Sequence, residues 1–436
     1  MMAVETKWTF DSETVKQWSE KRGEPAWLAE KRLAALADAE HLPMPNPDKT
    51  SLKRWKFTSF EKIEAAEPES QRFSDLPEEV TRLAGEEKDV QNLIVQRDGK
   101  TAFTKVEQEL VDNGVIFTDI ETAVKEHGDL VEKYLMSDAV KTNENRLTSL
   151  HTALMNGGVF IYVPKNVELQ TPIHTIFWQD DVKTGLFNHV LMVTEANSSL
   201  TYLENYVSFT EDVANANVVT EVYGGQGSKI KYGAVDNLES GVTSYVVRRA
   251  TLAKDGRIEW ALGQMNEGDT ISENTTFLMG DGSYGDTKTV HVGRGNQKQN
   301  FTSDVVAYGK QTEGYILTHG VMKDSATSIF NGINKIEKGG TNSHSEQTGR
   351  VLMLSSKARG DANPILLIDE DEVTAGHAAS VGKIDPIQMF YMKSRGLSQA
   401  EAERLIIHGF LEPVVGALPI DAVQTQVGEV IERKVY

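Results

Sequence analysis

Three short segments, SSLTY (198–202), SKIKY (228–232) and GRIEW (256–260), share one pattern that decides the fold. Each segment begins with a small residue, carries an aliphatic residue two positions later and ends with an aromatic residue two positions after that. The aromatic residues recur at intervals of 30 and 28 residues. Alternate side chains of a strand share one face, so this spacing is typical of a β-solenoid, where each coil buries its inner face against its neighbours.

The three segments lie within a long region of short strands that begins at Gly157 and continues to about residue 380. Runs such as GVFIYVPKN (158–166) and HVLMVTEAN (189–197) are separated by Gly, Asn, Asp and Ser, as expected of strands and turns. We therefore expect a mainly β protein. A β-sandwich, whose strands also alternate, is the alternative fold.

Helical patterns flank the strands on both sides. The segments AWLAEKRLAALADAE (26–40) and DIETAVKEHGDLVEKYLM (119–136) predict helices, the second with Asp119 as its N-cap. Residues 60–118, between these two helices, have no clear assignment. We divide the chain into an N-terminal helical region (1–150), a β-helix core (151–384) and a C-terminal helical domain (385–436).

The C-terminal helices have recognisable starts. Asp385 and Pro386 supply an N-cap and a first-turn proline, and Ser398 with Glu401 forms a capping box for the next helix. The tail IDAVQTQVGEVIERKVY (420–436) predicts a last amphipathic helix. A small helical domain of this kind is suited to docking another protein.

The composition excludes several classes of function. Across 436 residues the formal net charge is −19, which disfavours binding to nucleic acid or to anionic membranes. No apolar run approaches the roughly 20 residues of a membrane-spanning helix. The N-terminus MMAVETKWTFDSETVKQW (1–18) does not read as a secretory signal, so we expect a cytoplasmic protein. The chain has no cysteine, so any metal must be held by His, Asp or Glu.

Two segments partly match nucleotide-binding motifs, but each lacks a feature that such a motif requires. GDGSYG (280–285) matches the pattern G-x-G-x-x-G, but a strand-like run follows it where a helix is needed, so we interpret it as a β-turn. GKT (99–101) lacks the first glycine of a phosphate-binding loop, because Ile94 occupies that place. We expect no ATP hydrolysis by this chain alone.

Candidate metal ligands are few. His319, His344 and Glu346 could share a metal only if the fold brings them together, and surface or packed imidazoles are the alternative interpretation. The four consecutive carboxylates at 369–372 could bind a cation, but we favour a solvated strand edge that discourages mispairing.

His377 differs from the other histidines because it lies among small residues. Its neighbours Ala375, Gly376, Ala378 and Ala379 have no bulk to cover an imidazole, so another surface could approach the ring closely. The alternative interpretation is a strand of small residues packed under the C-terminal helices.

Four stretches of the chain, in this order, resemble the SufB/SufD family of the SUF iron–sulfur cluster assembly system. They are RWKFTSF (54–60), ALMNGGVFIYVPKNVELQTPI (153–173), PILLIDEDEV (364–373) followed by GHAASVGKID (376–385), and QMFYMKSRGLSQAEAERLIIHGF (388–410). Together they span the chain from about residue 50 onward. The segment GHAASVG, and Met392 in place of a cysteine, resemble SufD-type rather than SufB-type members.

The resemblance implies a right-handed parallel β-helix core with N-terminal and C-terminal helical domains. It also implies a non-enzymatic scaffold subunit of a SufB–SufC–SufD complex, with SufB and the ATPase SufC as partners and a homodimer as the alternative assembly of the isolated chain. An iron–sulfur cluster or iron would be held transiently and shared with SufB.

By the same resemblance, His377 aligns with the histidine that SufD-type proteins present to SufB, and a neutral imidazole is a suitable ligand for iron or a cluster. One departure is Ala375, because some SufD-type chains carry a cysteine there. The candidate contacts for SufC are Phe390, Tyr391, Arg395 and Gly396.

Two alternatives stay open at this point. A β-helix polysaccharide lyase or hydrolase would use paired carboxylates in a groove, and such enzymes are usually secreted. A SufB-like subunit that holds a cluster by itself is disfavoured because the chain has no cysteine.

Overall fold

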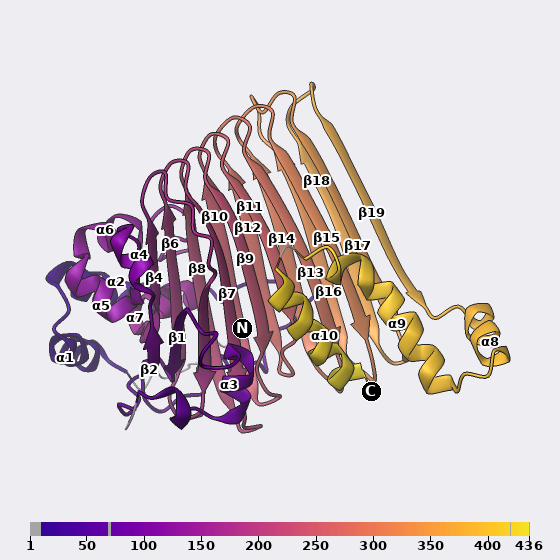
Figure 1. The fold of residues 1–436 in the computed structure, drawn as a ribbon, viewed down its shortest axis with the longest axis horizontal. Helices are drawn as coiled ribbons and strands as arrows, with labels where there is room; N and C mark the ends of the chain where they lie inside the picture. Colours follow the sequence, from indigo (N-terminus) through magenta and orange to yellow (C-terminus); the bar gives the residue numbers. More distant parts are fainter. Residues whose placement is uncertain (1–9, 69–70, 419, 436) are drawn as a thin grey trace.

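Two sheets face each other in the computed structural model, and from β4 onward the chain alternates between them one strand at a time (Figure 1). The described residues are 10–68, 71–418 and 420–435; the first nine residues, on which the expectation about a secretory signal partly rests, lie outside them. One sheet has ten strands in the order β19-β17-β15-β13-β11-β9-β7-β5-β1-β2, and the other has nine in the order β18-β16-β14-β12-β10-β8-β6-β4-β3.

The strands are β1 (Asn92–Arg97), β2 (Lys100–Lys105), β3 (Ile116–Asp119), β4 (Gly157–Val163), β5 (Ile173–Gln179), β6 (Leu186–Thr194), β7 (Ser199–Ser208), β8 (Ala214–Gly224), β9 (Lys229–Asn237), β10 (Val242–Leu252), β11 (Arg257–Gln264), β12 (Thr270–Leu278), β13 (Tyr284–Gly293), β14 (Lys298–Ala307), β15 (Glu313–Met322), β16 (Thr327–Ile336), β17 (His344–Met353), β18 (Arg359–Ile368) and β19 (Thr374–Lys383). The helices are α1 (Ser12–Arg22), α2 (Ala26–His41), the 3₁₀ turn η1 (Phe73–Asp75), α3 (Glu78–Ala84), α4 (Gln108–Asp112), α5 (Ile120–Glu126), α6 (Gly128–Tyr134), α7 (Arg146–Leu154), α8 (Pro386–Ser394), α9 (Gln399–Val415) and α10 (Asp421–Val435). Among the helices of the described residues, none has the length and apolar character to cross a membrane.

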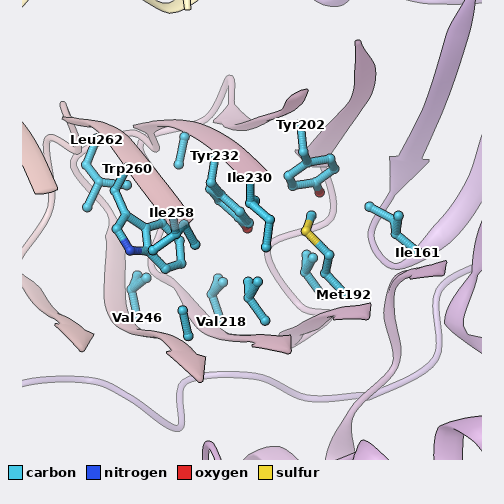
Figure 2. Packing of buried hydrophobic residues seen from close by; sticks show 14 of the residues in the cluster. Ile161, Met192, Tyr202, Val218, Ile230, Tyr232, Val246, Ile258, Trp260 and Leu262 are labelled. Atoms are coloured by element: carbon cyan, nitrogen blue, oxygen red, sulfur yellow. The ribbon is translucent and has the colours of Figure 1, made fainter. Parts of the chain in front are cut away.

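The repeated aromatic residues form a column inside the solenoid. Tyr202, Tyr232 and Trp260 lie opposite one another in the parallel register of β7, β9 and β11. Their ring centroids are 4.9 and 4.7 Å apart, and all three side chains are fully buried (Figure 2). The predicted β-solenoid with helical flanks is confirmed. The β-sandwich alternative is wrong, because its sheets would be antiparallel and these strands pair in parallel.

The N-terminal part of the chain contributes strands as well as helices. The segment that had no clear assignment contains β1, which pairs in parallel with β5, and β3, which pairs with β4. Asp119 caps α5 as predicted, accepting a hydrogen bond from the backbone N–H of Thr122. The single helix predicted over 119–136 is divided at His127 into α5 and α6, because Gly128 weakens helix continuity there. The three-domain division stays a prediction.

The C-terminal helices begin where their capping signals predicted. Asp385 accepts a hydrogen bond from the N–H of Ile387 at the start of α8, and Ser398 with Glu401 forms the capping box of α9. The predicted last helix corresponds to α10, which packs on the ten-stranded sheet; the end of its predicted range, Tyr436, lies outside the described residues. Gly263 permits this packing, since a Cβ there would approach the Val427 side chain to 2.6 Å.

Candidate functional site

The last coil of the solenoid is open. β18 and β19 each end their sheet, so each is paired on one side only. Figure 1 shows both strands at the end of the molecule opposite the N-terminal helices. Unpaired backbone N–H and C=O groups on such edges are a template for pairing with another chain. A partner chain that pairs with these edges would therefore cover the last coil.

His377 belongs to the inward-facing column of the aromatic repeat. It lies opposite Gln347 in the register of β17 and β19, and the column continues through Ile316 and Thr287 to Trp260. Gln347 is only 4% exposed, whereas His377 is exposed. The difference arises because a further coil covers Gln347 and no coil follows His377.

The surroundings of His377 leave its imidazole accessible, as predicted from the small neighbouring residues. Ala375 and Gly376 are half-buried, and Ala378 and Ala379 are exposed. No described residue forms a hydrogen bond or ion pair with the His377 ring. The alternative interpretation, a strand packed under the C-terminal helices, is wrong, because the strand from His377 to Lys383 is exposed throughout.

Apolar side chains are exposed on both strands of the last coil. Ile365, Leu367 and Ile368 on β18 are 37%, 45% and 36% exposed, and Val381 on β19 is 41% exposed. Rows of exposed aliphatic side chains on edge strands favour association. The sequence did not indicate this surface, because an apolar run on an edge strand has the same pattern as one on a buried strand.

The acidic turn at 369–372 stabilises the turn of the previous coil. The Glu370 carboxylate accepts hydrogen bonds from the backbone N–H of Gly339, at 2.9 Å, and of Asp371, and it pairs with Lys338. These hydrogen bonds, with the backbone bond from Gly339 foremost, lower the pKa of Glu370. The other three carboxylates of this turn are exposed, as expected for the solvated strand edge that the sequence favoured.

The other candidate ligands are not brought together. His344 and Glu346 share β17, and the His344 Nε2 lies 3.5 Å from a carboxylate oxygen of Glu346. His319 lies opposite Arg350, six residues along β17 from His344 (350 − 344), which corresponds to roughly 20 Å. Within the described ranges, no group of three or more His, Asp or Glu side chains could hold a metal. Iron bound at His377 would thus need ligands from elsewhere.

Helix α8 is the most exposed part of the C-terminal region. None of its residues is buried, and Figure 1 shows it standing away from the solenoid beyond β19. Phe390 and Tyr391 are 74% and 55% exposed, and the Arg395 guanidinium lies over the Tyr391 ring at 5.1 Å. Gly396 has a φ of 94°, a conformation that favours glycine, and it sets the turn into α9.

Helix α9 packs on the solenoid through apolar side chains and through a hydrogen bond from a histidine of β15. His319 on β15 donates its Nδ1–H to the backbone oxygen of Phe410 at 2.7 Å, and the two rings stack at 4.8 Å. Burial lowers the pKa of His319, so its ring is neutral at physiological pH. Ile407, Leu411 and Val414 pack into the same contact. The exposed α8 is therefore connected through α9 to β15, the third strand from the open edge of its sheet.

A family model described as the SufBD core domain of SUF system FeS cluster assembly matches residues 177–410. A second model, described as the SufBD protein N-terminal region, matches residues 89–175. The core match alone covers more than half of the chain, and it begins within β5 and ends within α9. The family match favours the scaffold interpretation over the polysaccharide lyase alternative.

Curated relatives agree with these models over nearly the whole chain. The iron–sulfur cluster assembly protein SufD of Bacillus subtilis is 58% identical over 436 residues, covering 100% of both chains. Iron–sulfur cluster assembly SufBD family proteins of Staphylococcus saprophyticus and Staphylococcus aureus are 26% and 27% identical, each covering 93% of this chain and 89% of the relative. The resemblance to SufD-type members is confirmed.

Proposed function

Because the chain belongs to the SufB/SufD family of iron–sulfur cluster assembly proteins, we propose that it is a non-enzymatic scaffold subunit of a SufB–SufC–SufD complex. In this proposal SufB covers the open last coil, SufC docks on the C-terminal helices, and the iron or cluster is cargo that is held only while it is assembled. One observation carries the proposal: His377 ends an interior column at an unpaired strand edge.

The open coil supports SufB as the partner at this end. SufB belongs to the same family, so a second solenoid would offer strand edges of the same kind to β18 and β19. Pairing along both edges would satisfy their free backbone groups and bury the aliphatic side chains of β18. The His377 ring would then lie in the seam between the two chains.

The chemistry of an uncovered imidazole supports a ligand role for His377. A neutral ring nitrogen ligates iron and replaces thiolate on some clusters. The chain has no cysteine, and no described cluster of acidic or histidine side chains completes a site around His377. SufB would supply the remaining ligands, so the cluster would belong to the assembled pair and not to this chain alone.

The proposal is tested by His377→Ala in the co-expressed complex. We expect the three subunits to co-purify as before, because the ring forms no hydrogen bond or ion pair with the described residues. Cluster formation, measured by absorbance and bound iron, should fall at least tenfold. The matched control is His344→Ala, which removes an outward-facing imidazole from the neighbouring strand. Clusters formed at the native yield by His377→Ala would overturn the proposal, and loss of assembly would make the residue structural.

The attachment of α9 supports a route by which SufC could act on the seam. SufC docked on α8 would pull on α9, which is anchored to β15 by the contact between His319 and Phe410. β15 is separated from β19 by β17 alone. ATP-driven movement of SufC would in this way reach the last coil without ATP hydrolysis by this chain.

A further inference from the structure

A hollow of about 410 Å³ lies on the solenoid at the beginning of β7, β9 and β11. Its lining contains Lys229, Lys231 and Arg257, with Glu259 as its one carboxylate within the described residues. The other lining residues are Leu169, Ser199, Leu200, Thr201 and Ile230. Three cations against one carboxylate make this a locally basic site on a chain whose net charge is −19.

The positive charges of the hollow have no protein counter-charge. In the described part of the chain, no carboxylate forms an ion pair with Lys229, Lys231 or Arg257, all of which are exposed. The Arg257 guanidinium instead lies over the Tyr284 ring, 4.2 Å from its centroid. The aromatic face orients this guanidinium and leaves its N–H donors free for a ligand.

The strand register places like charges next to each other. Lys229 lies directly opposite Arg257 across β9 and β11, where neighbouring strands are roughly 4.8 Å apart. Like charges in this arrangement are destabilising. Lys231 has Glu259 as its register partner, whereas Lys229 has Ser199 on its other side. The pair of Lys229 and Arg257 therefore gains most from a bound anion.

We propose that this hollow binds a phosphate-bearing small molecule of about mononucleotide size. An arginine fork, a lysine and the nearby hydroxyls of Ser199 and Thr201 make a donor set that suits phosphate oxygens. The volume lies within the range of roughly 300–1,000 Å³ that is usual for ligand pockets. Leu169 offers an apolar wall for the remainder of the ligand.

The experiment measures binding to the purified full chain by titration calorimetry, with AMP, inorganic phosphate and adenosine as probes. We expect AMP to bind with an affinity that falls as KCl is raised, and adenosine not to bind. Tighter binding of AMP than of phosphate would support a ligand of mononucleotide size. Equal binding would overturn that size and leave a site for free phosphate. The inference is overturned if none of the probes binds at millimolar concentration or if adenosine binds as well as AMP.

The variants Lys229→Gln and Arg257→Gln test whether AMP binds in this hollow. Each should raise the Kd of AMP about tenfold, equivalent to about 1.4 kcal/mol. The matched control is Lys298→Gln, which removes an exposed lysine that also begins a strand but lies in the other sheet. A Kd that is unchanged in both variants, with unchanged thermal midpoints, would overturn the assignment. These variants leave His377 and α8 intact, so the outcome is independent of the proposed function.

Discussion

Arg248 is the cation of a buried charge cluster inside the solenoid. Its Nε donates to Glu204 at 3.0 Å, and its Nη atoms donate to the two carboxylate oxygens of Asp236 at 3.0 and 2.7 Å. All three residues are at most 1% exposed. Burial raises the pKa of Glu204 to about 7, while the nearby Arg248 opposes that shift. The network lies beside the aromatic column, where Tyr202 bonds to Glu204.

Replacing Arg248 by Met should destabilise the fold strongly. The substitution leaves two carboxylates buried without their cation, which costs about 3–5 kcal/mol in the free energy of unfolding. Glu204→Gln should cost less, since this carboxyl is about half protonated near pH 7 and the pair of Arg248 with Asp236 survives. Urea unfolding at pH 7.5 measures both losses. A loss below about 1 kcal/mol for Arg248→Met would show that the interior is hydrated and tolerant of charge.

Because Lys434 is buried, we expect the free energy of unfolding to depend on pH in a specific way. Its Nζ is buried and donates to the backbone oxygens of Met265 and Asn266, and burial lowers its pKa from 10.5 to about 8. Between these two values the unfolded chain binds the proton and the folded chain does not, so stability rises as pH rises. The gain is about 3 kcal/mol from pH 8 to pH 10.5.

The variant Lys434→Met isolates this effect from other titrating groups. The difference in unfolding free energy between the wild-type chain and the variant should shift in favour of the wild type as pH is raised from 8 to 10. Urea unfolding at both pH values provides the measurement. A difference that is constant across this range would mean that the Lys434 ammonium is charged and adequately solvated in the folded protein.

At the scale of elements, local signals predicted where helices begin. A capping box depends on residues three positions apart, so Ser398 and Glu401 identified the start of α9 from sequence alone. Strand pairing between distant segments gives no such signal. The partner of Asn92 in β1 is Ile173 in β5, 81 residues later (173 − 92), and for this reason the N-terminal strands were missed.

Helix α8 should bind SufC through its exposed aromatic residues. The double substitution Phe390→Ala and Tyr391→Ala removes two rings that are 74% and 55% exposed, so the fold should be unaffected. Truncating an interface hot spot costs about 2 kcal/mol or more, and Tyr is among the residues enriched at hot spots. SufC binding should therefore weaken more than tenfold. The measurement is co-purification with SufC, followed by calorimetric titration.

The matched control for α8 is Tyr308→Ala, which removes a ring that is 42% exposed on a turn of the solenoid. This variant should bind SufC with the affinity of the wild-type chain. Equal affinity for SufC in the α8 double variant and in Tyr308→Ala would exclude α8 as the docking helix, and the exposed face of α9 around Leu405 would become the next candidate.

At the scale of the whole molecule, one repeat explains both the body of the solenoid and its open end. The column that holds Tyr202, Tyr232 and Trp260 continues through Thr287, Ile316 and Gln347 to His377. The aromatic pattern disappears after Trp260, so the sequence could predict the fold but not the place of His377 in the column. Its accessibility was predictable from the small neighbours, whereas the surface that we propose to cover it belongs to another chain.

The most direct test of the central claim uses the absence of cysteine in this chain. His377→Cys introduces a single thiol at the open end, and His344→Cys introduces one on the outer face of the neighbouring strand. Maleimide labelling of each thiol is followed by mass spectrometry, first in the isolated monomer and then in the complex with SufB and SufC. We predict that the complex slows labelling at position 377 at least tenfold and leaves position 344 unchanged. Labelling at position 377 that is equally fast in the monomer and in the complex would contradict the account.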